Sequence, residues 1–274
     1  DGFVDVTDRL AKSYSTDLIT ARSKKWIVDH KKEHPEQPFF IYLCYTAPHA
    51  GMRIPTTSHL TQNSNYPKGG GLTGGVQWNE DATDGQINTA TGTIDQGMHP
   101  EVTHAVGDDG KPWPDQAKRH ATMVRRIDDA MADLVHLLKD LEVDDNTLIV
   151  FTSDQGFAWG QHGFRSKVAP YDATIRSPLI VSMPSRLPKG KVSQTPVGGV
   201  DLVPTFFSFA EIELPWTMHG HDLTPLLQNP AAKWNRPLLM VHTGRDYGSD
   251  TAQIPTDESH LFRVAGIPWY ASIH

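Results

Sequence analysis

The stretch Thr147-Leu-Ile-Val-Phe-Thr-Ser-Asp-Gln-Gly156 joins an apolar run to a cluster of polar residues. Its apolar half, residues 148–151, is rich in β-branched side chains and is typical of a strand buried on both faces of a parallel sheet. The polar half then places Asp154 and Gln155 at the carboxyl end of that strand, where open α/β sheets bind their ligands. The stretch therefore predicts an α/β fold with a binding site at this strand end.

The segment that follows adds an imidazole and an ammonium group to the same region. Gly160-Gln-His-Gly163 and Lys167 come shortly after the strand. The oxygen donors of Asp154 and Gln155 suit calcium or magnesium better than zinc. His162 and Lys167 suit a doubly charged anion held beside the metal. Taken singly, each residue has an ordinary alternative, because Asp154 could cap the next segment and His162 and Lys167 could be solvated surface side chains.

Three further segments predict helices that flank the sheet. Residues 17–34 carry an apolar stripe, and a proline lies just past their end. Asp17 is one of the candidates for capping that helix at its start. Residues 118–141 repeat apolar side chains at three- and four-residue steps, which is the clearest helical pattern in the chain. Residues 201–210 predict a shorter helix with a proline in its first turn.

Another apolar run, residues 38–45, predicts a second strand buried on both faces. Cys44 lies in this run, so we expect an inert buried thiol. The run leads into Thr46-Ala-Pro-His49, which places His49 at a strand end as well. Further strands are predicted at 178–182, and in the loop-rich C-terminal part at 238–242 and 261–265.

Composition limits the classes of function. The 274 residues carry a formal net charge of −7 and no long basic run, so we expect no nucleic-acid partner. No apolar stretch approaches the roughly 20 residues that span a bilayer, so we expect no membrane span. Residues 51–115 are rich in Gly, Asn, Thr, Asp and Pro and show no period. We interpret them as a loop-rich insertion near the mouth of the site or as a partly disordered excursion.

Several short sequence motifs occur in a characteristic order along the chain. They are Pro38-Phe-Phe-Ile-Tyr-Leu43, Ala47-Pro-His49, Thr152-Ser-Asp154, Gly160-Gln-His-Gly163 with Lys167, Arg176-Ser-Pro-Leu-Ile-Val181 and His219-Gly-His-Asp-Leu-Thr-Pro-Leu-Leu227. Each string is weak by itself. Their order and spacing resemble the sulfatase family of the alkaline-phosphatase-like superfamily, and the resemblance runs through nearly the whole chain.

The resemblance implies a role for each candidate residue. Asp154 corresponds to a calcium ligand, and Gln155 stands where the family has a second ligand from the same strand, often Asn. His49 and Lys167 match the catalytic His and Lys that contact the sulfate. His162 matches a histidine that often faces the substrate. The implied cofactor is calcium, with a formylglycine nucleophile made from Cys or Ser.

The nucleophile motif itself is not matched where the family has it. Ser182-Met-Pro-Ser-Arg186 fits the serine version letter for letter, but it follows the metal-binding strand, so we interpret it as a coincidence and Ser182 as the end of a strand. We therefore expect an internal fragment that lacks the formylglycine region and the end of the C-terminal subdomain. We expect a partner chain or a missing segment to cover the incomplete sheet.

The predicted organisation is a partial α/β domain over residues 1–228, with a mostly parallel sheet flanked by helices and an insertion at 51–115. Residues 229–274 would begin a smaller α+β subdomain. The implied function is calcium-dependent hydrolysis of a carbohydrate or aryl sulfate ester, with a sulfated small molecule or glycan as partner and a periplasmic or secreted location. Alternatives are a phosphate or phosphonate ester hydrolase of the same superfamily and a non-catalytic anion- or glycan-binding remnant.

Overall fold

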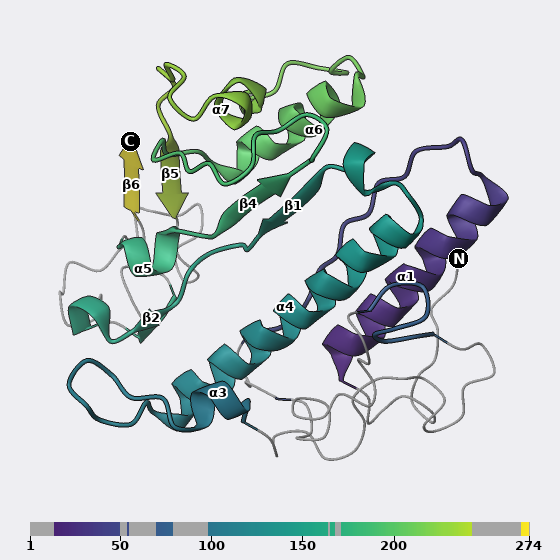
Figure 1. The fold of residues 1–274 in the computed structure, drawn as a ribbon. Helices are drawn as coiled ribbons and strands as arrows, with labels where there is room; N and C mark the ends of the chain where they lie inside the picture. Colours follow the sequence, from purple (N-terminus) through teal and green to yellow (C-terminus); the bar gives the residue numbers. More distant parts are fainter. Residues whose placement is uncertain are drawn as a thin grey trace, which may run out of the picture. The chain divides into compact units, whose positions relative to one another are not determined.

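The structure is a computed structural model in which helices come first along the described chain and short strands and helices follow from Ile149 on (Figure 1). It divides into two compact units, residues 1–144 and residues 145–274, which are considered separately. The predicted boundary between the α/β domain and the C-terminal subdomain, at residue 228, stays a prediction. The structure describes residues 14–49, 54, 70–78, 98–163, 165–167, 171–242 and 270–273.

The first unit is built on two long helices that pack against each other. Ile27 of the first helix meets Leu134 and Leu137 of the second in a buried apolar cluster, which confirms both predicted helices. The elements of this unit are α1 Ser15–Glu33, α3 Pro100–Thr103 and α4 Asp115–Asp140. Most of the segment predicted as an insertion, 51–115, lies outside the described residues.

Residues 38–45 run along these two helices, and only one face of the segment is covered by them. Phe39, Ile41 and Leu43 pack on the cluster between α1 and α4. The alternating side chains face outward, with Phe40 72% exposed and Tyr42 82% exposed. The prediction of burial on both faces is wrong, because the helices cover one face and no strand pairs with this run among the described residues.

Cys44 belongs to the outward-facing set of this run and is exposed. The prediction of a buried thiol at this position is therefore wrong. The cause is again that the helices cover only one face of residues 38–45. An apolar stretch of sequence does not say whether one or both of its faces will be covered.

Two buried ion pairs join α1 to α4. The Arg126 guanidinium donates from Nε to Oδ1 and from Nη2 to Oδ2 of Asp17, both at 2.7 Å. All of these side chains are fully buried. Asp17 was one of the candidates for capping α1, but the helix begins after Tyr14 without a side-chain cap, and Asp17 pairs with Arg126 instead.

The second pair joins Lys24 to Asp133 at 2.6 Å. Asp133 also accepts backbone N–H groups of Gly71 and Val76, each at 2.9 Å, so it ties residues 70–78 to α4. Burial raises the pKa of Asp133 and lowers that of Lys24, and the ion pair opposes both shifts. Burial also raises the pKa of the neighbouring Tyr45 to about 12.

The second unit begins with a two-stranded ladder. β1 Ile149–Thr152 pairs with β4 Leu179–Ser182, with Ile149 opposite Ser182 and Thr152 opposite Leu179. The pair is antiparallel, as is every ladder among the described residues, whereas we predicted mostly parallel pairing. β1 is half-buried rather than buried on both faces, because β4 is the one described strand beside it. Ser182 does end β4, as predicted.

The rest of this unit consists of short elements that carry the site and the C-terminal part. The predicted helix at 201–210 and the predicted strand at 238–242 are confirmed, while the predicted strand at 261–265 lies outside the described residues. The elements are η2 Asp144–Asn146 at the junction of the units, β2 Ala158–Trp159, η3 Gln161–Gly163, β3 Arg165–Ser166, α5 Asp172–Ile175, η4 Gly199–Asp201, α6 Leu202–Ala210, α7 Thr224–Gln228, β5 Leu239–His242 and β6 Tyr270–Ile273.

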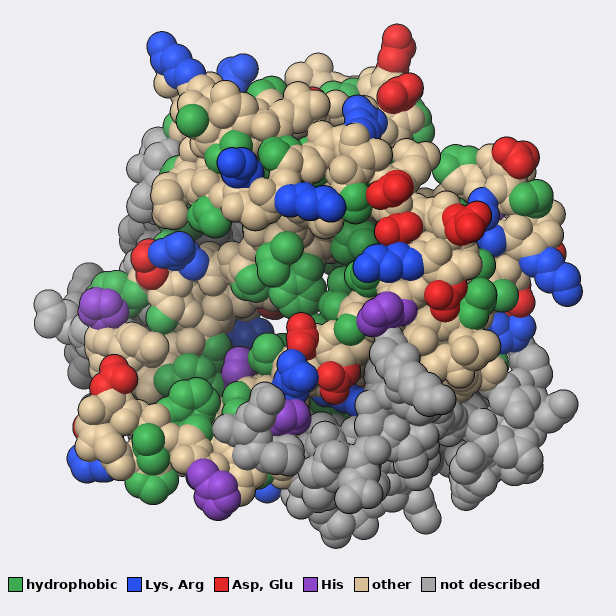
Figure 2. Space-filling model, viewed as in Figure 1, with side chains coloured by type: hydrophobic (Ala, Val, Ile, Leu, Met, Phe, Trp, Pro, Cys, Tyr) green, Lys and Arg blue, Asp and Glu red, His purple; other side chains and the backbone are tan. Residues whose placement is uncertain are grey.

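Charged side chains and helix lengths bear on two of the expectations from composition. On the face shown in Figure 2, Lys and Arg side chains are interspersed with Asp and Glu. Among the described residues, no helix has the length and apolarity needed to cross a bilayer.

Candidate functional site

The polar residues after β1 form an exposed turn at the strand's carboxyl end. The Asp154 side chain is 76% exposed. Its Oδ1 accepts the backbone N–H of Gln155 at 2.9 Å, and Ser153 Oγ donates to the Gln155 carbonyl at 3.0 Å. These local bonds hold the turn in place. They use Oδ1 of Asp154 and not its second carboxylate oxygen, Oδ2.

A small hairpin returns the chain to this turn. β2 and β3 pair antiparallel, with Ala158 opposite Ser166 and Trp159 opposite Arg165. Continuing that register carries Lys167 back toward the residues that follow β1. Lys167 Nζ lies 3.7 Å from Asp154 Oδ2, which is ion-pair range but too long for a hydrogen bond. The structure thus brings together a predicted metal ligand and a predicted anion-binding lysine.

The loop at the tip of this hairpin presents His162. Gly160 and Gly163 both have positive φ, and the Gly163 N–H donates to the Gly160 carbonyl at 3.0 Å. His162 itself is left-handed, with φ 54°, which is unusual for a non-glycine residue. Its ring stacks on Tyr171 at 4.0 Å between centroids and 16° between planes. The paired glycines therefore shape the loop, and Tyr171 holds the imidazole.

Tyr171 is a contributor that the sequence did not reveal. No spacing rule in the sequence says that Tyr171 stacks on His162. The contact depends on α5, which begins one residue later and fixes where Tyr171 lies.

His49 belongs to the first unit and is exposed. Its backbone N–H donates to the Thr46 carbonyl at 3.0 Å, so it ends a tight turn after the extended run 38–45. The Ala47–Pro48 peptide in this turn is cis. We predicted His49 at the end of a strand, but residues 38–45 form no paired strand, and the role of His49 beside the residues of the second unit stays a prediction.

The donor set at the β1 end fits one part of a calcium site. Asp154 offers a carboxylate and Gln155 an amide oxygen, which are hard donors of the right kind. Calcium takes about six to eight oxygen ligands, so these two side chains supply a minority of a complete shell. No cluster of three or more His, Cys, Asp or Glu residues suited to a metal occurs among the described residues.

Gly156 lets this turn lie directly on α5. Its N–H donates to the Thr174 carbonyl at 2.9 Å. A Cβ at this position would overlap the Ala173 carbonyl oxygen and lie 2.9 Å from that of Arg176. We expect Gly156→Ala to lower the free energy of unfolding by about 1–3 kcal/mol, because backbone atoms would have to move. Urea unfolding followed by circular dichroism measures the change.

Gly199→Ala is the matched control, since a Cβ there meets no atom within 4 Å. Equal stability of the two variants would show that the turn does not pack on α5 as described.

Comparison with known proteins identifies the family. The family model for sulfatases matches residues 2–212, which is most of the chain. The chain belongs to the sulfatase family.

Curated relatives of this sulfatase chain carry sulfatase names. An N-acetylglucosamine-6-O-sulfatase of Bacteroides thetaiotaomicron is 37% identical over 116 residues, covering 41% of this chain and 21% of the relative. A putative extracellular sulfatase Sulf-1 homolog of Caenorhabditis elegans is 28% identical and covers 79% of this chain and 28% of the relative. The chain thus spans less than a third of the length of either relative.

A solved structure supports the fold assignment. Its title describes a complex with the substrate D-glucosamine-2-N,6-O-disulfate. It superposes with a TM-score of 0.62 at 21% identity, covering 96% of this chain and 59% of the other. At that level of identity the likeness shows the fold alone. The sulfatase chain therefore shares the α/β fold of this solved structure and matches 59% of its length.

Proposed function

We propose that the protein carrying this chain hydrolyses sulfate esters, with Asp154, Gln155, His162, Lys167 and His49 in its active site. The observation that carries the proposal is the approach of Lys167 to Asp154 at the end of β1. A cation beside a metal-binding carboxylate is the arrangement that a doubly charged group requires. The family match adds that the group is a sulfate.

Each residue has a distinct task in this proposal. Lys167 contributes a positive charge that binds the sulfate oxygens and stabilises charge in the transition state. His162, held by Tyr171, donates a hydrogen bond to the substrate. His49 donates a proton to the departing alcohol oxygen. None of the assigned residues is the nucleophile, which we propose to be a formylglycine as in the family.

The proposed metal is calcium, bound in part by Asp154 and Gln155. A divalent cation at this place would neutralise negative charge on the ester oxygens. The Asp154 side chain is 76% exposed and lies 3.7 Å from Lys167 Nζ, so Asp154 would hold the ion while Lys167 would bind the sulfate. Gln155 would supply its side-chain carbonyl oxygen to the same ion.

The proposed substrates are sulfated sugars or small sulfated molecules. A curated relative is named for N-acetylglucosamine-6-O-sulfate, and a structure with the same fold holds a sulfated glucosamine. We propose an exported location as well, since relatives from nematode and fly are named extracellular sulfatases.

The test compares matched esters on the intact protein. We expect 4-nitrophenyl sulfate to be hydrolysed faster than 4-nitrophenyl phosphate, with activity lost in EGTA and restored by calcium. Asp154→Ala should raise the calcium concentration for half-maximal activity by at least about tenfold. It should also reduce the rise in melting temperature that calcium produces, because a weaker ligand stabilises the folded state less.

Asp109→Ala is the control, since Asp109 is an exposed carboxylate of the first unit that pairs with Lys111. Its calcium response should equal that of the parent protein. Faster hydrolysis of the phosphate ester would favour the phosphatase alternative. Full activity in EGTA would remove the metal from the proposal while leaving the sulfate specificity to stand on the ester comparison.

A further inference from the structure

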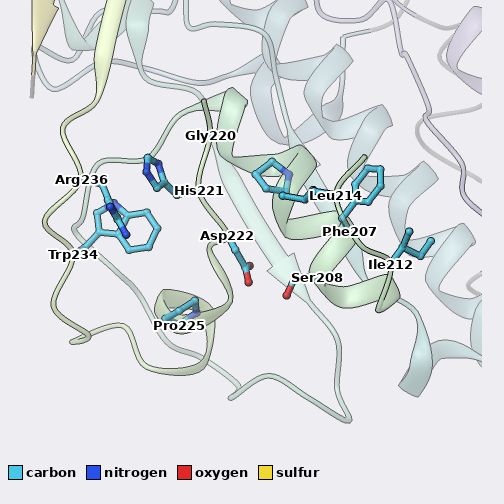
Figure 3. A pocket seen from close by; sticks show the side chains of 11 residues that line it. Phe207, Ser208, Ile212, Leu214, Gly220, His221, Asp222, Pro225, Trp234 and Arg236 are labelled. Atoms are coloured by element: carbon cyan, nitrogen blue, oxygen red, sulfur yellow. The ribbon is translucent and has the colours of Figure 1, made fainter. Parts of the chain in front are cut away.

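A pocket of about 460 Å³ lies in the second unit between α6, α7 and the segments that follow each of them (Figure 3). None of the residues assigned above lines it. It is within the range of small-molecule sites, which are mostly apolar with a few polar groups at fixed positions. The residues that matter here are Phe207, Ser208, His221, Asp222, Trp234 and Arg236.

One wall of the pocket is held rigidly. The backbone N–H of His221 donates to Oδ1 of the buried Asp201 at 2.8 Å. The N–H of Leu223 donates to Thr205 Oγ1 at 2.9 Å. Just before these anchors, Gly220 lies so close to the backbone of residue 200 that a Cβ would overlap the Val200 carbonyl oxygen. The wall is therefore formed before any ligand arrives.

A carboxylate in this wall is fixed and partly free. Asp222 Oδ1 accepts the backbone N–H of Thr224 at 2.8 Å and its hydroxyl at 2.6 Å. Oδ2 of Asp222 accepts no hydrogen bond from the part of the chain that the structure describes. Ser208 Oγ lies 3.4 Å from the same Thr224 hydroxyl. Asp222 and Ser208 thus offer an acceptor and a hydroxyl to a ligand with hydroxyl groups.

An aromatic ring and a cation complete the set. Trp234 meets His221 edge-on, with centroids 6.3 Å apart and planes at 80°. Trp234 is half-buried and lines the pocket, where its ring can contact a ligand. Arg236 is exposed, and its guanidinium forms no hydrogen bond or ion pair with any residue described in the structure. It is the permanently charged cation among the lining residues.

We propose that this pocket binds a sugar ring that carries one anionic group. The C–H face of the sugar ring packs on Trp234, because the flat indole offers a large apolar surface. Ring hydroxyls bond to Asp222 and Ser208, and the anionic group pairs with Arg236, whose planar guanidinium matches sulfate and carboxylate alike. The cavity is large enough for one or two sugar rings. This binding requires no hydrolysis and does not depend on the proposed function.

The test reads binding at Trp234 itself. The intact protein is labelled with 5-fluorotryptophan, and the Trp234 resonance is identified in the ¹⁹F spectrum as the one lost in Trp234→Phe. Glucose 6-sulfate, glucuronate and glucose are then titrated in parallel. We expect the resonance to shift with one or both charged sugars at concentrations at least about tenfold lower than with glucose, because a charge-assisted bond is added. Whichever charged sugar binds tighter identifies the anion.

Arg236→Ala should weaken binding of that charged sugar by about tenfold or more and bring it to the level of glucose. Lys233→Ala is the matched control, since Lys233 is an exposed cation on the same segment that does not line the pocket, and it should leave the titration unchanged. Three results overturn the proposal: a Trp234 resonance that no sugar moves, equal binding of glucose and the charged sugars, or an Arg236→Ala titration like that of the parent.

Discussion

Replacing Arg126 by alanine is expected to lower the free energy of unfolding by about 3–5 kcal/mol. The guanidinium forms a bidentate pair with Asp17, and both side chains are fully buried. Removing one partner leaves the Asp17 carboxylate buried without its counter-ion, and the interior cannot solvate it. The loss should loosen the packing of α1 on α4, which the Lys24–Asp133 pair and the apolar cluster around Ile27 continue to join.

Arg125→Ala is the matched control on the same helix. Arg125 is exposed and pairs with Asp128 at 2.8 Å, so its removal should cost no more than about 1 kcal/mol. Chemical unfolding of both variants, followed by circular dichroism, gives the comparison. A double replacement of Asp17 and Arg126 by leucine and methionine should recover much of the loss, because no charge is then left unpaired. Equal stability of the Arg126 and Arg125 variants would contradict the pairing.

The buried pair also shows where sequence reasoning fails. The helix at 118–141 was predictable because its apolar period is local and long. Asp17 was misassigned as a cap because an acidic residue at a helix start has a local explanation. Its real partner lies 109 residues away, and no spacing rule connects them.

The burial of the two apolar runs could not be predicted from the sequence either. Residues 38–45 and 148–151 were predicted as strands buried on both faces because their side chains are continuously apolar. In the structure, Phe40 and Tyr42 are exposed and β1 is half-buried. Burial depends on what packs against each face, and that is decided by segments elsewhere in the chain. Extended conformation was predictable, whereas pairing direction and coverage were not.

The candidate site was more predictable than the fold around it. Asp154 and Lys167 were grouped because they follow one strand end, and the short β2–β3 hairpin does bring them within 3.7 Å. A hairpin of this kind is local, so sequence proximity became spatial proximity. The pocket at α6 and α7 was not predicted, since Ser208, Asp222 and Trp234 come from three separate segments. Only the folded chain places them together.

Replacing Lys167 by alanine is expected to lower kcat for a sulfate ester by about 10²–10³ in the intact protein, the effect typical of one electrostatic donor. The ammonium contributes most where charge develops on the transferring group, so kcat should fall more than KM rises. Lys167→Arg should restore part of the activity, because it keeps the charge with altered geometry. Folding should change little, since the ion pair with Asp154 is long and half open to solvent.

Lys189→Ala separates this role from a general loss of positive charge. Lys189 is exposed in the turn after β4, so its removal should leave kcat, KM and the melting temperature unchanged. Steady-state kinetics with 4-nitrophenyl sulfate, together with thermal unfolding, distinguish the two lysines. If Lys167→Ala keeps full kcat while Asp154→Ala loses activity, then the ammonium serves only to balance the carboxylate. The anion would then have to be held by His162, His49 and the metal alone.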